Sequence, residues 1–465
     1  MWRNFKHVVL NDTPVDFVMC LTCSHVVTFK KKDGTKGMHA HKCGSEEPAP
    51  VQRKMTSFVE RHSLPQPARE SLTTELIKFV ACDMRPYSSV DGTGFKSLCQ
   101  TLVNFGARYG QFDVTRELPD RTSLARHVPD LVEKTKNDVK SLLATSEYIA
   151  LTSDGWTDDF RKVSYVTVTA HFFDNNLHLQ SCILDTGSVD ERKTAEVLGS
   201  IVTNVSQQFG FSMNKVTIVT DNASNMVAAF RDRCCRLSCF AHCLNLVVTE
   251  MLAVDNDEFK SMLACCKTLV RHFKHTGLQR QLKKTLKQDC PTRWNSTFSM
   301  MESVLDQYDA VHELLNARKE LRYLYAVDTE VMKAVVCFLT DFRDASEKAC
   351  ADKAPTLHLV APMFHRLLTT TCADADGDCS IVLALKGKGR AALQSKVRLD
   401  VMHDVAAFLN PCMKGLGFIP PARKKAAMEF VNKLLREATT ESSSQEDINN
   451  AEDDVPVCTV QYCCI

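Results

Sequence analysis

The sequence lacks a long uncharged apolar stretch, which argues against a chain that crosses a bilayer. Residues 1–6 also lack the apolar run that a secretory signal needs. The formal net charge is only +1, with 57 basic and 56 acidic residues. Affinity for nucleic acid would therefore have to come from local basic patches and not from a global field. Near the end, Tyr462 occupies the position at which a prenylation box requires cysteine.

Cysteine, in contrast, is abundant. The 21 cysteines are an odd number and are scattered through segments with helix or strand patterns. In the absence of a secretory signal, such cysteines are best interpreted as reduced thiols and metal ligands in the cytosol or nucleus. The 465 residues allow two or three domains, with ample material for a core.

Residues 1–45 have the pattern of a zinc finger. Cys20 and Cys23 lie at the predicted turn of a β-hairpin, and His39, His41 and Cys43 follow. Two thiolates, one histidine and a third cysteine would give Zn²⁺ the closed tetrahedral geometry of a structural site. The spacing from Cys43 favours His39 as the ligand, whereas the local His-Lys-Cys arrangement favours His41, so both stay open. The alternative is a pair of cysteines in an ordinary surface loop.

Basic residues cluster around this predicted finger, among them Lys30, Lys31 and Lys32. They could neutralise the phosphates of double-stranded DNA, although such a cluster is also often a solvated face. A linker over residues 46–70 follows, and apolar spacing then predicts a helical domain over residues 71–145. This helical domain carries further basic residues that could contact phosphates.

Two apolar, β-prone runs further along each end in a carboxylate. The first ends at Asp154 and the second, residues 216–220, ends at Asp221. Two strands that each deliver a carboxylate at their carboxyl end suit a paired Mg²⁺ site for phosphoryl transfer. The alternative is that each aspartate caps the turn or helix that follows it.

The pattern between and around these aspartates predicts the order of the elements in residues 146–256. Three antiparallel strands come first, and then a helix, a strand, a helix, a strand and a helix. That is the order of an RNase H-like core with a mixed sheet, so the fold class is α/β. We expect the two aspartates to converge at one end of this sheet.

Residues 257–436 predict an all-helical region inserted after this core. Its first part, residues 259–286, has the pattern of an amphipathic helix pair rich in lysine and arginine, including Lys267. It leads to Arg293 and Trp294, where a basic side chain could hold a phosphate and a broad ring could stack on an unpaired base. A tryptophan that anchors a helix on the core is the alternative. Residues 437–465 contain no basic residue and predict a disordered acidic tail.

Four motifs, in this order along the chain, strongly resemble those of hAT-superfamily DNA transposases, especially the Hermes and hobo branch. The motifs are Asp154-Gly155-Trp156-Thr157-Asp158, Val219-Thr220-Asp221-Asn222-Ala223, Cys239-Phe240-Ala241-His242 and Cys290-Pro291-Thr292-Arg293-Trp294-Asn295-Ser296-Thr297. At the N-terminus, Trp2, Phe5 and Gly34-Thr35 resemble the corresponding positions of BED-type zinc fingers.

The resemblance implies roles for several residues. Asp154 and Asp221 would be catalytic carboxylates, His242 would support their geometry, and Trp294 would interact with a base pushed out of the duplex. The helical region before the core would bind DNA and contact other proteins. The family also carries a third acidic residue in a Ser-x-x-x-Glu-Arg-x-Phe-like stretch. This chain has no such stretch, so we expect the C-terminal part of the core to be missing.

Two functions follow as hypotheses. In the first, the chain is a nuclear, zinc-dependent DNA-binding protein that derives from a hAT transposase and cannot excise DNA. In the second, it is a working transposase that cuts DNA with Mg²⁺ through Asp154 and Asp221. An interaction protein that keeps only helical contact surfaces is a further alternative. The expected partners are double-stranded DNA and a second copy of the chain, without a membrane.

Overall fold

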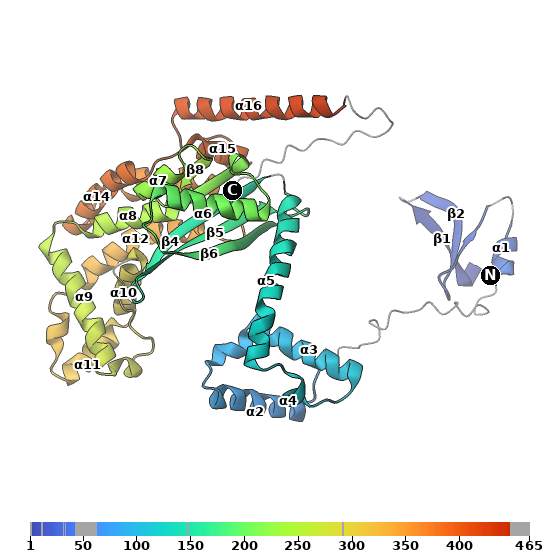
Figure 1. Ribbon diagram of the computed structural model, residues 1–465, viewed down its shortest axis with the longest axis horizontal. Helices are drawn as coiled ribbons and strands as arrows, with labels where there is room; N and C mark the ends of the chain where they lie inside the picture. Colours follow the sequence, from blue (N-terminus) through green and yellow to red (C-terminus); the bar gives the residue numbers. More distant parts are fainter. Residues whose placement is uncertain are drawn as a thin grey trace. The chain divides into compact units, whose positions relative to one another are not determined.

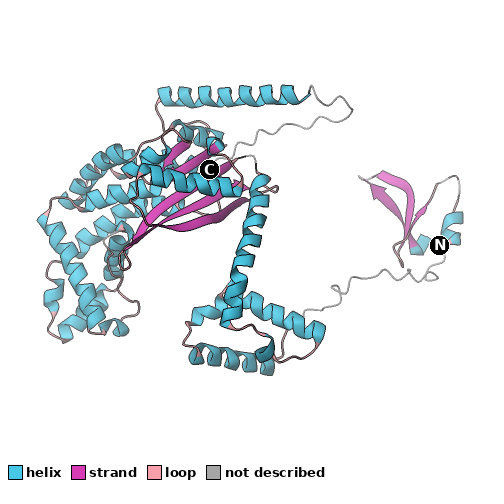
Figure 2. Cartoon of the chain, viewed as in Figure 1, coloured by secondary structure: helices cyan, strands magenta, loops and turns pink. Residues whose placement is uncertain are grey.

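The computed structural model describes residues 2–10, 13–30, 32, 34–41, 63–146, 148–290 and 293–446. The chain divides into two compact units, Met1–Pro119 and Asp120–Ile465, which are described separately below (Figure 1). Helices and one small sheet make up the first unit, and a larger sheet surrounded by helices makes up the second (Figure 2). Among the described residues, no helix combines the length and apolar character needed to cross a bilayer.

The first unit begins with a small antiparallel sheet in the order β1-β2-β3. Its strands and the short helix after them are β1 Phe5–Leu10, β2 Thr13–Cys20, β3 Val26–Thr28 and α1 Lys36–Ala40. The predicted hairpin around Cys20 and Cys23 is confirmed, since β2 pairs antiparallel with β3. The buried core of this part consists of Phe5, Val18, Cys20 and Met38. So small a core calls for a metal ion or a similar staple to hold the fold.

Three helices complete the first unit: α2 Gln66–Cys82, α3 Thr93–Tyr109 and α4 Val114–Glu117. Helix α2 begins before residue 71, inside the segment predicted to be a linker, because prolines are tolerated in a first helical turn. The earlier linker residues, 46–62, lie outside the described residues. Within the part of the chain that the structure describes, neither α2 nor α3 buries a side chain, so their apolar faces are not covered by these residues.

The second unit contains a five-stranded sheet in the order β6-β5-β4-β7-β8, led in by the long helix α5 Arg121–Ala144. Its strands are β4 Ile149–Asp158, β5 Val163–Phe173, β6 Leu179–Val189, β7 Val216–Thr220 and β8 Cys235–Ser238. The helices between and after them are α6 Ala195–Phe209, α7 Ser224–Phe230 and α8 Phe240–Leu252. The predicted order of strands and helices is confirmed.

One detail of the prediction is wrong: β4 does not end at Asp154. It continues to Asp158 because β5 keeps pairing with it, up to the pair Asp158↔Val163. The parallel pairing of β4 with β7 does stop just before Asp154, at the pair Ser153↔Thr220. A ladder that ends on one side of a strand and continues on the other gives no local signal in the sequence.

One face of this sheet is well covered. Leu151, Val168 and Ile218 are buried on it and pack in one cluster with Leu198 and Val202 of α6. Because successive strand residues point to opposite faces, Thr152 and Val219 face the other side. Both are only half-buried.

The helices after α8 pack around one large hydrophobic cluster that includes Phe259, Phe273, Trp294, Phe298 and Phe342. They are α9 Asp257–His275, α10 Trp294–Asp306, α11 Tyr308–Ala317, α12 Thr329–Ala349, α13 Leu357–Arg366 with the π-helical turn Leu367–Thr371, α14 Ser380–Lys396, α15 Val401–Leu409 and α16 Pro421–Glu446.

Two expectations for this region differ from the structure. The helix pair predicted over residues 259–286 is one helix, α9, and a 3₁₀ turn, because Gly277 adopts φ 70° and ends the helical path. Helix α16 continues to Glu446, ten residues into the segment predicted to be disordered, because residues 437–446 contain neither proline nor glycine. Residues 447–465 lie outside the described residues.

Candidate metal and nucleic-acid sites

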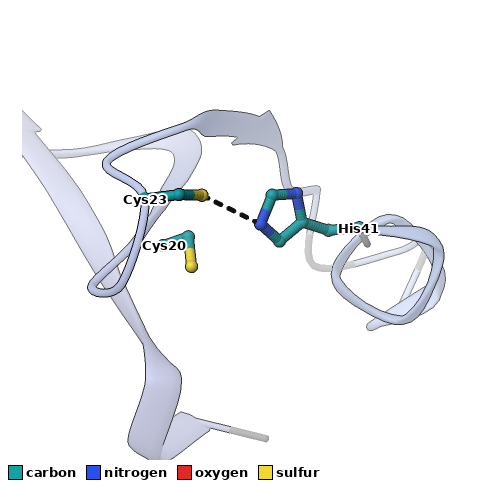
Figure 3. Close-up of side chains that lie close together, drawn as sticks. All are labelled: Cys20, Cys23 and His41. Carbon is teal, nitrogen blue, oxygen red and sulfur yellow. Dashed lines mark hydrogen bonds between the residues drawn. The ribbon is translucent and has the colours of Figure 1, made fainter. Parts of the chain in front are cut away.

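The finger brings three predicted zinc ligands together. The ligand atoms of Cys20, Cys23 and His41 all lie within 4.8 Å of one another. Cys23 Sγ lies 3.2 Å from His41 Nε2 and points toward the ring, and the Cys20 thiol lies beside this pair (Figure 3). The His41 ring is held in place by stacking on His25, at 5.5 Å between centroids, and by an edge contact with Phe5.

This geometry separates the two candidate histidines. Among the described residues, His41 joins the group and His39, which is exposed on α1, does not. A tetrahedral zinc centre places its ligand atoms roughly 3.8 Å apart, so the three side chains suit Zn²⁺. The predicted fourth ligand, Cys43, lies outside the described residues. Zn²⁺ bound here would link the β2–β3 turn to the end of α1.

The described basic residues next to the finger are exposed to solvent. Lys30 and Lys32 are exposed, as is Lys36 at the start of α1. Lys31 lies outside the described residues. Exposed lysines at this position remain candidate phosphate contacts.

Asp154 and Asp221 occupy neighbouring positions on adjacent parallel strands. Each directly follows the last registered pair of β4 and β7, Ser153↔Thr220. Adjacent strands lie about 4.8 Å apart, and residues in register point to the same face. Asp154 on β4 and Asp221 directly after β7 therefore both follow the same end of this ladder.

Each of these carboxylates also makes a local hydrogen bond. Asp154 Oδ1 accepts the backbone N–H of Gly155 at 2.9 Å, and Asp221 Oδ1 accepts that of Ala223 at 3.1 Å. The bond of Asp221 is typical of an aspartate that shapes a turn, which was the alternative at the sequence level, whereas Asp154 lies within β4, which continues to Asp158. Among the described residues, no third metal-ligating side chain groups with the pair in the way that the finger ligands group.

Arg236 on β8 fixes the backbone beside Asp221, a role that the sequence did not indicate. Its guanidinium donates to Thr220 Oγ1 at 2.9 Å, to the Asp221 carbonyl at 2.6 Å and to Asn222 Oδ1 at 2.7 Å. The prediction missed this residue because it placed the strand from Leu237 onward. A half-buried arginine next to a predicted strand was the available signal.

Lys193, just before α6, makes a similar connection on the other side. Its ammonium donates to the Trp156 carbonyl at 3.3 Å and to Thr157 Oγ1 at 3.1 Å. Its own carbonyl accepts from Asn225 Nδ2 of α7 at 2.9 Å. The last part of β4 and helix α7 are therefore tied together through this loop.

His242 lies in the first turn of α8 and is half-buried. Cys239 is the N-cap residue of this helix, and its backbone N–H donates to the Thr220 carbonyl at 2.8 Å. Burial raises the pKa of the Cys239 thiol, and the neighbouring Cys350 and the charge of Asp154 raise it further. The thiol is therefore protonated at neutral pH. His242 thus lies in a helix whose N-cap residue is bonded to the end of β7, and its supporting role stays a prediction.

Trp294 opens α10 and is only 4% exposed. Its ring meets Phe298 edge-on at 6.2 Å, and its backbone N–H donates to Asn245 Oδ1 of α8 at 3.3 Å. A ring buried in this way offers no free face to a base. The structure therefore favours the alternative, a tryptophan that anchors α10. Arg293, directly before it, is exposed and stays a candidate phosphate contact.

Lys267 of α9 is engaged with the segment before Trp294. It forms an ion pair with Asp289 at 2.8 Å, and that carboxylate also accepts from Thr297 Oγ1 at 2.6 Å. Burial alone would raise the pKa of Asp289, but the hydrogen bonds from Lys267 and Thr297 outweigh it and leave the pKa below its usual value. Lys267 is therefore less available to DNA than its sequence context indicated.

Comparison with known families gives three matches along the chain. Residues 59–123 match the Hermes transposase DNA-binding domain, residues 152–239 the ZBED1 RNase-like domain and residues 237–338 the ZBED1 RNase-like helical domain. The last two together cover the five-stranded sheet and the first helices after it.

Several curated proteins are similar over most of the chain. The hobo transposase of Drosophila melanogaster is 30% identical over 421 residues, which cover 88% of this chain and 63% of that protein. Zinc finger protein 618 of Mus musculus is 26% identical over 87% of the chain and 44% of its own length. Zinc finger BED domain-containing protein 6 of Homo sapiens is 27% identical over 70% of the chain and 35% of its own length. The chain thus spans between about a third and two thirds of these relatives.

Proposed function

The chain is a hAT-type transposase-like protein, and from this premise we propose that it binds double-stranded DNA in the nucleus through a zinc-dependent finger and does not excise DNA. The observation that supports DNA binding is the match of residues 59–123 to a transposase DNA-binding domain. The gathered Cys20, Cys23 and His41 support the zinc dependence. Exposed Lys30 and Lys32 would supply phosphate contacts beside the metal.

The second half of the proposal concerns catalysis. Residues 146–256 would form an RNase H-like core in which Asp154 and Asp221 are remnants of a metal site. Two carboxylates hold one Mg²⁺ weakly and cannot clamp the attacking and leaving oxygens of a strand-cleavage reaction on both sides. The hydrogen bond from the Ala223 backbone to Asp221, which shapes the turn after β7, supports a structural role for that carboxylate.

A second candidate function is a working Mg²⁺-dependent transposase. The observation that favours it is the position of Asp154 and Asp221 directly after the last registered pair of β4 and β7, Ser153↔Thr220, where Arg236 donates to the Asp221 carbonyl. If Mg²⁺ bound there, it would supply Lewis-acid stabilisation to a phosphate, while Arg236 would hold the backbone of Asp221. His242 would support the geometry from α8.

A homo-oligomer also belongs to the proposal. The helices α2 and α3 bury no side chain, yet Ile77, Val103 and Tyr109 on them are each more than half exposed. A second copy of the chain would cover such faces.

We expect DNA binding to weaken steeply with salt and to depend on the lysines of the finger. In fluorescence anisotropy with a labelled duplex, Lys30→Ala with Lys32→Ala is expected to lower the slope of log K against log salt by roughly 1.8, since each lost phosphate contact contributes about 0.9. Lys333→Ala on α12, which removes an exposed lysine paired with Glu330, serves as the matched control. An affinity for DNA that changes neither with salt concentration nor in the double lysine variant would refute the proposed interface.

A further inference from the structure

The sheet face opposite α6 is not filled. A groove of about 510 Å³ lies between this face and the later helices, with a floor that includes Thr152, His171 and Val219. Its walls come from the loop after α12, where Cys350 lies, and from α15 and α16, with Phe430 and Leu434 on the latter. We call this feature the sheet groove.

The sheet groove is long enough for a peptide. Its lining runs from Leu179 on β6 to Leu237 on β8, and therefore crosses all five strands. Four spacings between adjacent strands amount to about 19 Å. An extended segment of about six residues covers that length, at about 3.3 Å per residue.

The groove also contains a polar group that suits a peptide backbone. His403 Nδ1 accepts a hydrogen bond from the backbone N–H of Asp400 at 2.9 Å, and this bond completes the capping box of α15. The neutral ring then carries its hydrogen on Nε2. The ring belongs to a side chain that is only 3% exposed and that lines the groove. A peptide carbonyl would accept from this Nε2.

We propose that residues 455–465 of this same chain dock in the sheet groove. This segment, Val455-Pro456-Val457-Cys458-Thr459-Val460-Gln461-Tyr462-Cys463-Cys464-Ile465, lies outside the described residues and has no charged side chain. Its apolar side chains match the aliphatic and aromatic walls of the groove. The match contrasts with the acidic segment 447–454 directly before it.

The length of the chain permits this return. Helix α16 lines the groove at Leu434 and runs another 12 residues to Glu446, a rise of about 18 Å. The eight residues 447–454 can span about 26 Å when extended. The terminal segment therefore reaches the groove within one molecule, and it would cover apolar surface on the sheet. The inference does not depend on DNA binding.

Native cysteines provide the test in the full-length protein. Cys350 is exposed and lines the groove, and the terminal segment carries Cys458, Cys463 and Cys464. After brief oxidation with copper phenanthroline, mass spectrometry should find disulfides between Cys350 and the terminal cysteines. We expect their yield to exceed those to exposed Cys337 on α12 by tenfold or more, because a tethered docked segment has a high effective concentration (about millimolar). Cys350→Ser should remove them, and Cys337→Ser should not.

A mixture of unlabelled and ¹⁵N-labelled chains identifies the donor of the segment. Cross-links confined to one isotope support docking within one molecule, whereas mixed pairs would overturn it in favour of a second copy. Equal yields at Cys350 and Cys337 would also overturn it. In addition, Val219→Glu on the groove floor should lower the yield about tenfold, in contrast to Ile183→Glu, whose side chain is 70% exposed outside the groove.

Discussion

Removal of zinc is expected to unfold the finger while the second unit stays folded. Of its described residues the finger buries just Phe5, Val18, Cys20 and Met38, so we expect metal binding to supply most of its folding free energy. For structural zinc this contribution is about 10–16 kcal/mol at neutral pH. We therefore expect Cys20→Ser to lose bound zinc, measured by plasma mass spectrometry, and to bind duplex DNA far more weakly than the parent chain.

The matched control is Cys82→Ser, which removes an exposed thiol at the end of α2. It should retain stoichiometric zinc and the parent's affinity for DNA. Full zinc content in Cys20→Ser would show that the ligand assignment is wrong. If a zinc-free chain bound DNA as tightly as the parent chain, the finger would not be part of the DNA interface.

Trp294→Ala is expected to lower the free energy of unfolding by about 3–5 kcal/mol, the range for a large side chain removed from a packed core. The reason is that Trp294 is 4% exposed and sits in the main helical cluster beside Phe298. Trp294→Phe should cost less because it keeps part of the ring contact. Urea denaturation followed by circular dichroism measures both values.

Trp156→Ala provides the comparison. Trp156 is 44% exposed and stacks on Tyr165 at 5.4 Å between centroids. Its loss should cost clearly less, roughly 1 kcal/mol, since an aromatic pair contributes about 0.5–1.5 kcal/mol beyond its burial. A Trp294→Ala protein of undiminished stability that had lost DNA affinity would restore the base-stacking role.

The sequence predicts the order of the core elements well because its strands alternate and its helices have a clear apolar spacing. It fails where long-range pairing decides the boundary, as in β4, which β5 extends from Asp154 to Asp158. It also fails at Gly277, whose left-handed conformation ends α9 where the apolar pattern continues. Both outcomes depend on neighbours that are distant in sequence or on a single backbone angle.

The candidate sites show the same division. The parallel pairing of β4 with β7, which ends one residue before Asp154 and Asp221, could be anticipated from the two apolar runs, whereas the convergence of the two carboxylates stays a prediction. The choice of His41 over His39 depends on where α1 turns, which spacing alone left open. Trp294 has the same motif context whether it is buried or exposed, and only packing against Phe298 distinguishes the two.

The most direct test of the proposed loss of catalysis is a Mg²⁺-dependent cleavage assay on a duplex with a terminal inverted repeat. The full-length zinc-loaded protein is compared with its Asp154→Asn variant, in which the local bond to Gly155 can persist through the amide oxygen. We predict that the two proteins bind the duplex equally and that neither cuts it above background. Strand cleavage by the parent chain that Asp154→Asn abolishes would contradict this account and establish a working transposase site.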